Sequence, residues 1–176
     1  MRLAVGLAIL LAAAGSADRA VGTEDDPAAL LKKTGFTLSE AIAKAAKQAG
    51  DAPAVVAELE EEDGKAIYSI EFAQGTKILE INLDAKSGDL VKKETEDEDK
   101  SAVAKACKVA LAKAIETALQ KVPGLAFVAE AGLEEGRAEI EVQILSEGKI
   151  QKVAIDGTTG AVLRVRSKKP EKDEKK

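Results

Sequence analysis

The side chains that most often perform catalysis are scarce in this chain of 176 residues. Histidine is absent, and Cys107 is the only cysteine. These counts exclude nucleophiles that are activated by histidine and the common zinc sites, which need several His or Cys ligands. A single cysteine cannot form an internal disulfide, and we expect this one to be buried. We therefore predict no catalytic residue, no cofactor and no metal site.

Carboxylates are the remaining groups that could work as an acid and a base. In a glycosidase two of them flank the sugar, in a cleft that is normally lined with aromatic side chains, but this chain has no Trp, one Tyr and three Phe. The carboxylates that could pair are expected on strand faces in water, where their pKa values stay ordinary. We therefore predict that the protein is not an enzyme. The two sets are Glu58 with Glu71 and Glu80, and Glu130 with Glu139 and Glu141.

A further group of acids lies in the tract 92–100, which reads KKETEDEDK. One interpretation is a cation site. The other is a solvated linker whose acids stabilise the start of the following helix. Calcium loops interleave their acids with glycine and carbonyl ligands, and this tract lacks that arrangement. The pattern therefore favours an acidic linker at 93–100.

The start of the chain has the layout of a secretory signal peptide. Arg2 precedes an apolar run at 3–14, and small residues and a charged pair follow. We expect a signal peptide at 1–17 and a flexible leader at 18–35. The run is shorter than the roughly 20 residues that cross a bilayer. These features predict an exported protein, periplasmic or extracellular, without a permanent membrane span.

One stretch of sequence occurs twice. The segment 64–91 aligns without a gap on 136–163, 72 positions later. Glycines, alternating apolar residues and an aspartate recur at matching places, which indicates a tandem duplication. The identical residue pairs include Gly64 and Gly136, Lys77 and Lys149, Ile78 and Ile150, Asp84 and Asp156, and Gly88 and Gly160.

The first unit reads as one helix followed by strands. Thr37 and Glu40 form a capping-box pattern, and the helix it opens is expected to run to about residue 49 with a face that is mostly alanine. The strands alternate apolar and polar residues, which predicts an antiparallel sheet with one face under the helix and one face in water. They are expected at about 54–60, 66–72, 77–84 and 90–92.

The second unit repeats this order with a longer helix, expected as one piece from about 96 or 101 to 122. Its strands are expected from 125 onward, and the closing strand lies at 161–165. The predicted fold class is α+β, with two repeats at 36–92 and 101–166. Each repeat is a helix packed on a three- to four-stranded antiparallel sheet. The charged end of the chain, 167–176, is expected to be disordered.

Each unit also contains an Asp-x-x-x-Gly turn, formed by Asp84 and Gly88 in the first and by Asp156 and Gly160 in the second. An Asp side chain in such a turn accepts hydrogen bonds from backbone amides, and the glycine takes a positive φ. We interpret both as fold-signature turns and assign no ligand or reaction to them.

The first unit, with its helix, strands and turn, resembles the PepSY domain. The resemblance rests on Leu-Ser-Glu-Ala-Ile at 38–42, Gly-Lys-x-x-Tyr-x-Ile-Glu at 64–71 and Ile-x-Leu-Asp-Ala-Lys-Ser-Gly-Asp-Leu at 81–90. The second unit is similar but departs from the pattern, with Ile140 in place of Tyr68 and Gly157 in place of Ala85.

PepSY domains are found in propeptides of some secreted metalloproteases and in many bacterial envelope proteins. The resemblance implies a helix on a curved antiparallel sheet and an exported role that often involves protein binding or peptidase regulation. It brings no catalytic residue with it.

Two functions without catalysis follow. The first is a module that binds another envelope protein, such as a peptidase it restrains, through its open sheet face or an edge strand. The alternative is a periplasmic small-ligand or cation-binding protein that uses its outward carboxylates. The net charge of −5 argues against nucleic acid as a partner.

Overall fold

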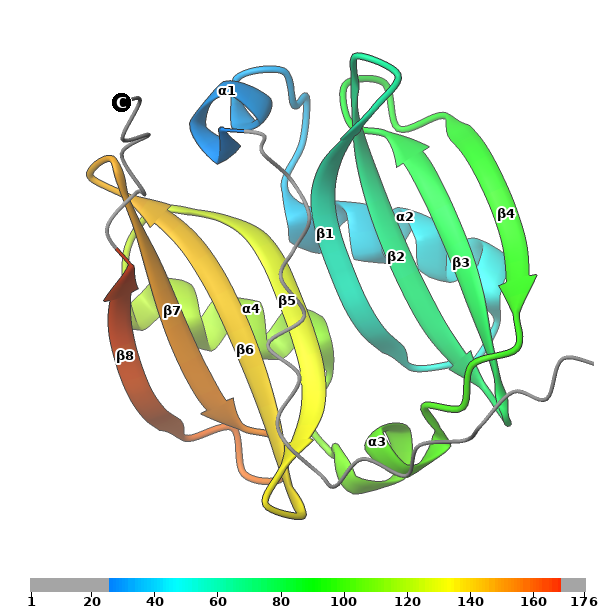
Figure 1. The fold of residues 1–176 in the computed structure, drawn as a ribbon, viewed down its shortest axis with the longest axis vertical. Helices are drawn as coiled ribbons and strands as arrows, with labels where there is room; N and C mark the ends of the chain where they lie inside the picture. Colours follow the sequence, from blue (N-terminus) through cyan, green and yellow to red (C-terminus); the bar gives the residue numbers. More distant parts are fainter. Residues whose placement is uncertain (1–25, 169–176) are drawn as a thin grey trace, which may run out of the picture.

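The two repeats form one continuous antiparallel sheet in the computed structural model, which describes residues 26–168. The strand order is β4-β3-β2-β1-β5-β6-β7-β8, and both long helices lie on the same side of the sheet (Figure 1). The first repeat comprises α1 (Pro27–Leu31), α2 (Leu38–Ala49), β1 (Ala54–Glu62), β2 (Lys65–Gln74), β3 (Lys77–Asp84) and β4 (Leu90–Glu96). The second comprises α3 (Ser101–Ala106), α4 (Leu111–Lys121), β5 (Leu125–Glu134), β6 (Arg137–Ser146), β7 (Lys149–Asp156) and β8 (Val162–Lys168).

Local sequence accounts for the limits of α2. Thr37 Oγ1 accepts a hydrogen bond from the Glu40 amide, and Glu40 Oε2 accepts one from the Thr37 amide at 2.7 Å, which is the predicted capping box. Gly50 ends the helix with a φ of 66°. The small buried face lets the helix lie close to the sheet, and it consists of Leu38, Ala41, Ile42, Ala45 and Ala49.

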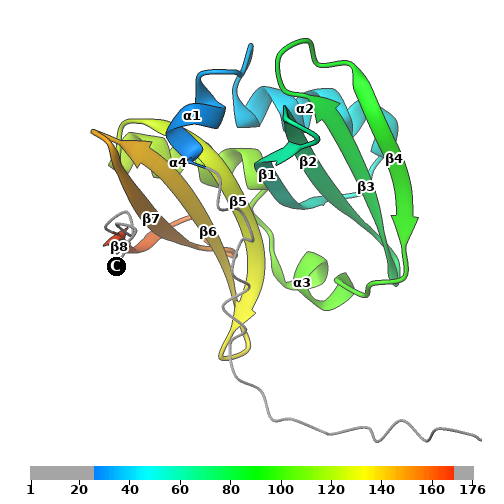
Figure 2. The ribbon, with the colours of Figure 1, turned by 45° about the horizontal axis from the view of Figure 1, so that its top comes forward.

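The seam between the repeats lies between β1 and β5. Three residue pairs connect these strands, with Ala57 opposite Ala129 at the centre. Helices α2 and α4 contact each other behind the seam, and the short helices α1 and α3 lie at its opposite ends (Figure 2). One hydrophobic core therefore runs through both repeats, and the middle of β1 pairs with the middle of β5.

The sequence prediction of one long helix in the second repeat is wrong. The helix stops after Ala106, and α4 starts only at Leu111. The amides of Lys108 and Val109 both donate to the carbonyl oxygen of Gly157, at 2.7 and 3.0 Å. These bonds hold the intervening residues in a non-helical path. The interruption is therefore imposed by a contact with the far end of the repeat.

The first repeat contains a similar contact, in which the Gly35 amide donates to the carbonyl oxygen of Ala85 at 2.9 Å, although this donor lies one position earlier in the repeat than Lys108. Gly35 and Ala85 precede Cys107 and Gly157 by the repeat length of 72. By the same spacing, α4 is the counterpart of α2, and α3 is the counterpart of α1. The two units are thus more alike than the sequence patterns indicate.

Several other expectations concern the ends of elements. The closing strands β4 and β8 extend to Glu96 and Lys168, so part of the expected linker and the start of the expected tail belong to strands. Helix α1 lies within the expected leader. The expected signal peptide and most of the tail lie outside the described residues. Among the described helices, none is long and apolar enough to cross a membrane.

Candidate functional site

The two fold-signature turns direct their carboxylates at the backbone. Asp84 Oδ1 accepts from the amides of Lys86 and Ser87 at 2.9 and 2.8 Å, and Gly88 has a φ of 80°. These backbone hydrogen bonds lower the pKa of Asp84. An acid used in this way stabilises the turn and is poorly suited to hold a ligand.

The corresponding turn in the second repeat has the same geometry. Asp156 Oδ1 accepts from the amides of Thr158 and Thr159 at 2.9 and 2.7 Å, which lowers its pKa, and Gly160 has a φ of 79°. The structure also explains the glycine at 157, because a Cβ there would lie 2.9 Å from the Cβ of Ala138.

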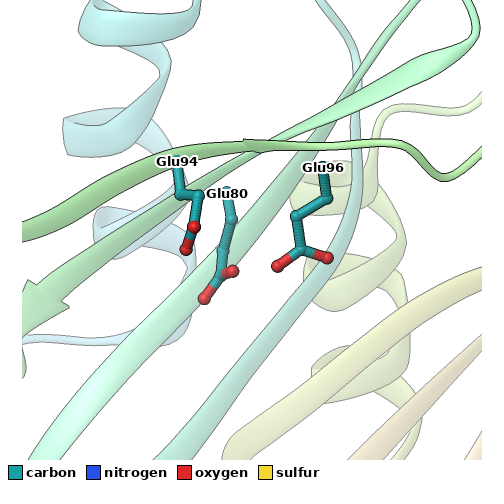
Figure 3. A group of neighbouring side chains, drawn as sticks. All are labelled: Glu80, Glu94 and Glu96. Carbon is teal, nitrogen blue, oxygen red and sulfur yellow. The ribbon is translucent and has the colours of Figure 1, made fainter.

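Acidic side chains gather on the sheet face of the first repeat that lies away from α2. Carboxylate oxygens of Glu80, Glu94 and Glu96 all lie within 4.8 Å of one another, and the side chains come from the neighbouring strands β3 and β4 (Figure 3). Lys92 Nζ lies 2.5 Å from Glu94 Oε2 and 4.0 Å from Glu80 Oε2. A hydrogen bond to Glu80, together with the charge of Glu80, raises the pKa of Glu96. We call Glu80, Glu94 and Glu96 the glutamate trio.

This face is less open to water than the sequence indicates. Ser69 and Asn82, expected on an exposed face, are buried. Burial raises the pKa of Glu60 to about 7, and the charges of Glu58, Glu80 and Glu62 add to the effect. Two carboxyl groups on this face, those of Glu60 and Glu96, therefore have raised pKa values.

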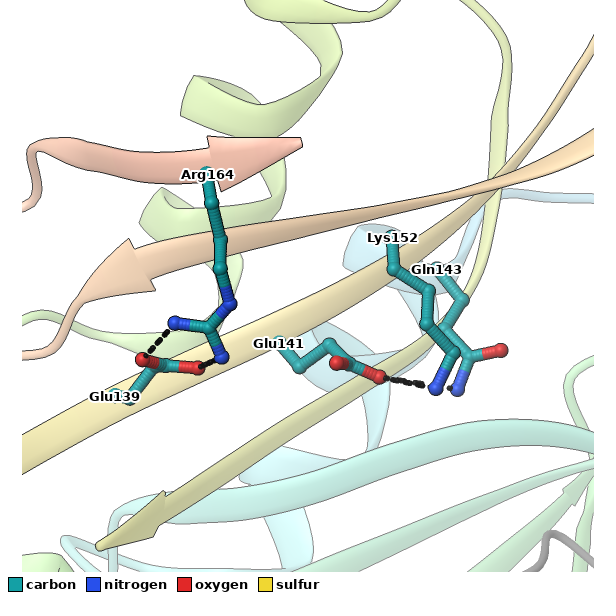
Figure 4. A network of polar contacts seen from close by, with 5 residues as sticks. All are labelled: Glu139, Glu141, Gln143, Lys152 and Arg164. Atoms are coloured by element: carbon teal, nitrogen blue, oxygen red, sulfur yellow. Dashed lines mark hydrogen bonds and ion pairs between the residues drawn. The ribbon is translucent and has the colours of Figure 1, made fainter. Parts of the chain in front are cut away.

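The same face of the second repeat neutralises its acids. The two terminal nitrogens of the Arg164 guanidinium, Nη1 and Nη2, both donate to the carboxylate of Glu139, with Nη1 2.7 Å from Oε2. Lys152 Nζ lies 2.8 Å from Glu141 Oε1 (Figure 4). The bond to Glu139 raises the pKa of Arg164. The candidate set of Glu130, Glu139 and Glu141 thus contains two carboxylates that are paired with cations.

Among the carboxylates of the first candidate set, Glu71 is also held by a cation. Lys100 Nζ lies 2.5 Å from Glu71 Oε2, and both side chains are largely buried. The third member, Glu80, belongs to the glutamate trio. The structure therefore places these acids in different ionic environments. It also brings Glu94 and Glu96, which the sequence pattern placed in a linker, next to Glu80.

Cys107 is only partly buried, although we expect a buried residue from the sequence. It lines an apolar cavity of about 310 Å³ between the repeats, together with Ile42, Phe72 and Leu111. Burial raises the pKa of its thiol, which makes it a poor nucleophile.

Two strand edges remain at the ends of the sheet, because no strand within residues 26–168 lies beyond β4 or β8. Every residue of β4 is exposed. Val91 and Leu163, which are counterparts in the two repeats, are 51% and 50% exposed. Unpaired backbone groups and nearby apolar side chains are what an added strand requires.

Comparison with known proteins places these observations in a family. A family model for PepSY, described as the peptidase propeptide and YPEB domain, matches residues 37–94 and 108–166. No curated protein matches the sequence. Two solved structures are similar at 19% and 14% sequence identity. The first is a candidate lipoprotein from Clostridium difficile 630, with a TM-score of 0.47 over 79% of this chain and 97% of the other. The second is the YpeB C-terminal domain of Bacillus megaterium, with a TM-score of 0.31 over 78% of this chain and 68% of the other.

These structural likenesses are too distant to say anything about activity. The family match is stronger, because it covers both repeats and more than half of the chain. It coincides with the two helix-and-sheet units and their signature turns. The chain belongs to the PepSY family and carries two tandem copies of its domain.

Proposed function

We propose that this protein is an exported module without catalytic activity that binds another envelope protein, such as a peptidase it restrains. PepSY domains are typically exported, generally lack catalysis and are associated with peptidases. The observation that carries the proposal is the pair of strand edges, β4 and β8, at the two ends of the eight-stranded sheet. On this proposal, residues 1–17 are the export signal.

Pairing at the seam decides which edges are available. In an isolated repeat, β1 or β5 would be an edge strand, but here they pair with each other. The ends of the sheet therefore offer a partner strand the edges of β4 and β8. Each of these strands has a register irregularity near its start, which leaves the regular stretches 92–96 and 164–168 for pairing.

The two edges differ in charge, and this favours different partner segments. In β8 the stretch 164–168 reads RVRSK, whereas in β4 the stretch 92–96 reads KKETE. An acidic segment suits β8, and a segment of mixed charge suits β4. Complementary charge fixes register and partner choice more than it adds affinity.

The experiment uses the chain as bait in a crosslinked envelope extract, with Val91→Asp and Leu163→Asp as edge variants. Both side chains are half-exposed, so the variants should fold. We expect a defined partner that one edge variant fails to recover, and amide hydrogen exchange in β4 or β8 should slow when that partner is added. Leu133→Asp, on an exposed residue away from both edges, is the matched control.

Recovery of no partner after crosslinking would contradict the proposal. So would equal recovery by both edge variants and the control. If the partner is a peptidase, its cleavage of a peptide substrate should fall when the chain is added, and the variant that loses the partner should also lose this inhibition.

A further inference from the structure

The glutamate trio brings three carboxylates together on one face of the sheet. Glu80 and Glu94 lie directly opposite each other in the β3–β4 pair, where like charges destabilise the sheet. Glu96 follows on the same face of β4, and Figure 3 shows all three side chains extending from one side of the sheet. Lys92, which contacts two of the three carboxylates, supplies one positive charge for three acids.

A second observation at the same place concerns Asn82. It lies on β3 two residues from Glu80 and is only 3% exposed, and its Oδ1 atom has no hydrogen-bond donor. Its two cross-strand neighbours are Ser69 and Lys92. Ser69 hydroxyl donates to Glu80 at 3.5 Å, and Lys92 contacts Glu80 and Glu94. Asn82 therefore lies between two side chains that extend to the trio, and it presents a buried oxygen that lacks a positive partner.

The second repeat has basic residues at the positions that the glutamate trio occupies in the first repeat. The counterparts of Glu80, Glu94 and Glu96 are Lys152, Arg166 and Lys168, and the register is the same, since Lys152 lies opposite Arg166. The counterpart of Asn82 is Ala154, which has no polar side chain. At these positions the second repeat has Lys and Arg residues, whereas the first has Glu residues with Lys92 as their neighbouring cation.

We propose that this face of the first repeat binds one calcium ion, with the carboxylates of Glu80, Glu94 and Glu96 and the amide oxygen of Asn82 as ligands. All four ligands are oxygens, which hard cations prefer, and calcium accepts irregular geometry with water completing its shell. Magnesium demands a nearly ideal octahedron, which side chains from two strands do not impose. Glu94 is half-exposed, so the ion can enter from solvent without unfolding.

The proposal goes beyond partner binding and does not depend on it. The ion neutralises the repulsion between β3 and β4 and gives Asn82 Oδ1 a positive partner. It therefore orders β4, the edge strand of the first repeat. Calcium sites in extracellular modules have dissociation constants of about 10⁻⁴–10⁻³ M, and we expect this range.

The test is calorimetric titration of calcium into the chelator-treated chain, in parallel with thermal melting. We expect one ion per chain and a melting temperature that rises with calcium, because a ligand of the folded state stabilises it. The double variant Glu94→Gln with Glu96→Gln should bind about tenfold more weakly or worse, since two charged ligands are lost. It should still fold, because like-charge repulsion is removed.

Two further variants make the test specific. The second repeat supplies one of them, Glu80→Lys with Glu94→Arg, which should no longer respond to calcium. The control is Glu134→Gln with Glu135→Gln, at exposed acids in the β5–β6 turn, which should bind as the native chain does. Absence of both binding heat and a melting shift at millimolar calcium would overturn the proposal. Equal affinity in the native chain and the Glu94→Gln, Glu96→Gln variant would overturn it as well.

Discussion

Substitution of Glu60 by glutamine should stabilise the protein at high pH and leave its stability unchanged at low pH. Glu60 is partly buried on β1. Burial and the neighbouring charges of Glu58, Glu80 and Glu62 raise its pKa from 4.5 to about 7. The folded chain therefore holds a proton on Glu60 in a pH range where the unfolded chain has released it.

The direction in which stability changes with pH follows from proton linkage. Stability falls with pH wherever the folded state binds more protons than the unfolded state, here between about pH 4.5 and pH 7. The destabilisation is absent below this window and complete above it. The difference between the unfolded-state and folded-state pKa values of Glu60 corresponds to a loss of about 3 kcal/mol in the free energy of unfolding. Solvent screening at this partly exposed side chain reduces the loss to about 1–2 kcal/mol. Glutamine resembles the protonated acid and removes this cost.

The assay is thermal melting of the native chain and of Glu60→Gln across this window, in calcium-free buffer. Above pH 7 the variant should melt about 2–8 °C higher, and at pH 4 the two should coincide. Glu130→Gln, on an exposed residue of the neighbouring strand β5, is the control and should show no such pH-dependent gain. An equal gain at both pH values, or no gain at high pH, would refute the reasoning.

Two further predictions concern the core. Ile140→Asp and Ile70→Asp each place a charge at a residue that is fully buried, at a cost of several kcal/mol, comparable to the stability of a domain. Because both repeats share one core, calorimetry should show loss of the whole fold, and a surviving transition from the other repeat would contradict this. Gly157→Ala should destabilise the chain by about 1–3 kcal/mol in urea unfolding, because its Cβ would crowd that of Ala138 at 2.9 Å. The matched change Ala85→Gly leaves no such clash and should cost about 1 kcal/mol or less, and a similar loss in both variants would show that crowding is not the cause.

The accurate part of the sequence prediction rests on local chemistry. Alternation of apolar and polar residues gave the strands, and the Thr37 and Glu40 pattern gave the start of α2, because neighbouring residues satisfy these interactions. The family followed from the same features, since its motifs are strand and turn residues. The family match confirms two tandem PepSY units.

Several features that the sequence did not reveal involve partners that are distant in sequence. The run 101–122 is rich in helix-forming residues, and only the carbonyl of Gly157 interrupts it. The sequence pattern predicted a linker at Glu94 and Glu96, because the tract around them is acidic and has no apolar alternation. Pairing with β3 makes these residues part of strand β4, beside Glu80. The raised pKa of Glu60 depends on residues from β1 and β3 together, which no local pattern contains.

The sequence by itself determined the duplication, the helix-and-strand composition of each unit and the absence of histidine-based chemistry, because periodicity, turn residues and composition are local properties. Only the tertiary structure decided that β1 and β5 pair, so that two repeats share one sheet and one core. That pairing leaves β4 and β8 as the edges. The tertiary structure also decided which acidic side chains contact cations and which contact one another, because side chains from different strands come together only when the register of the sheet is fixed.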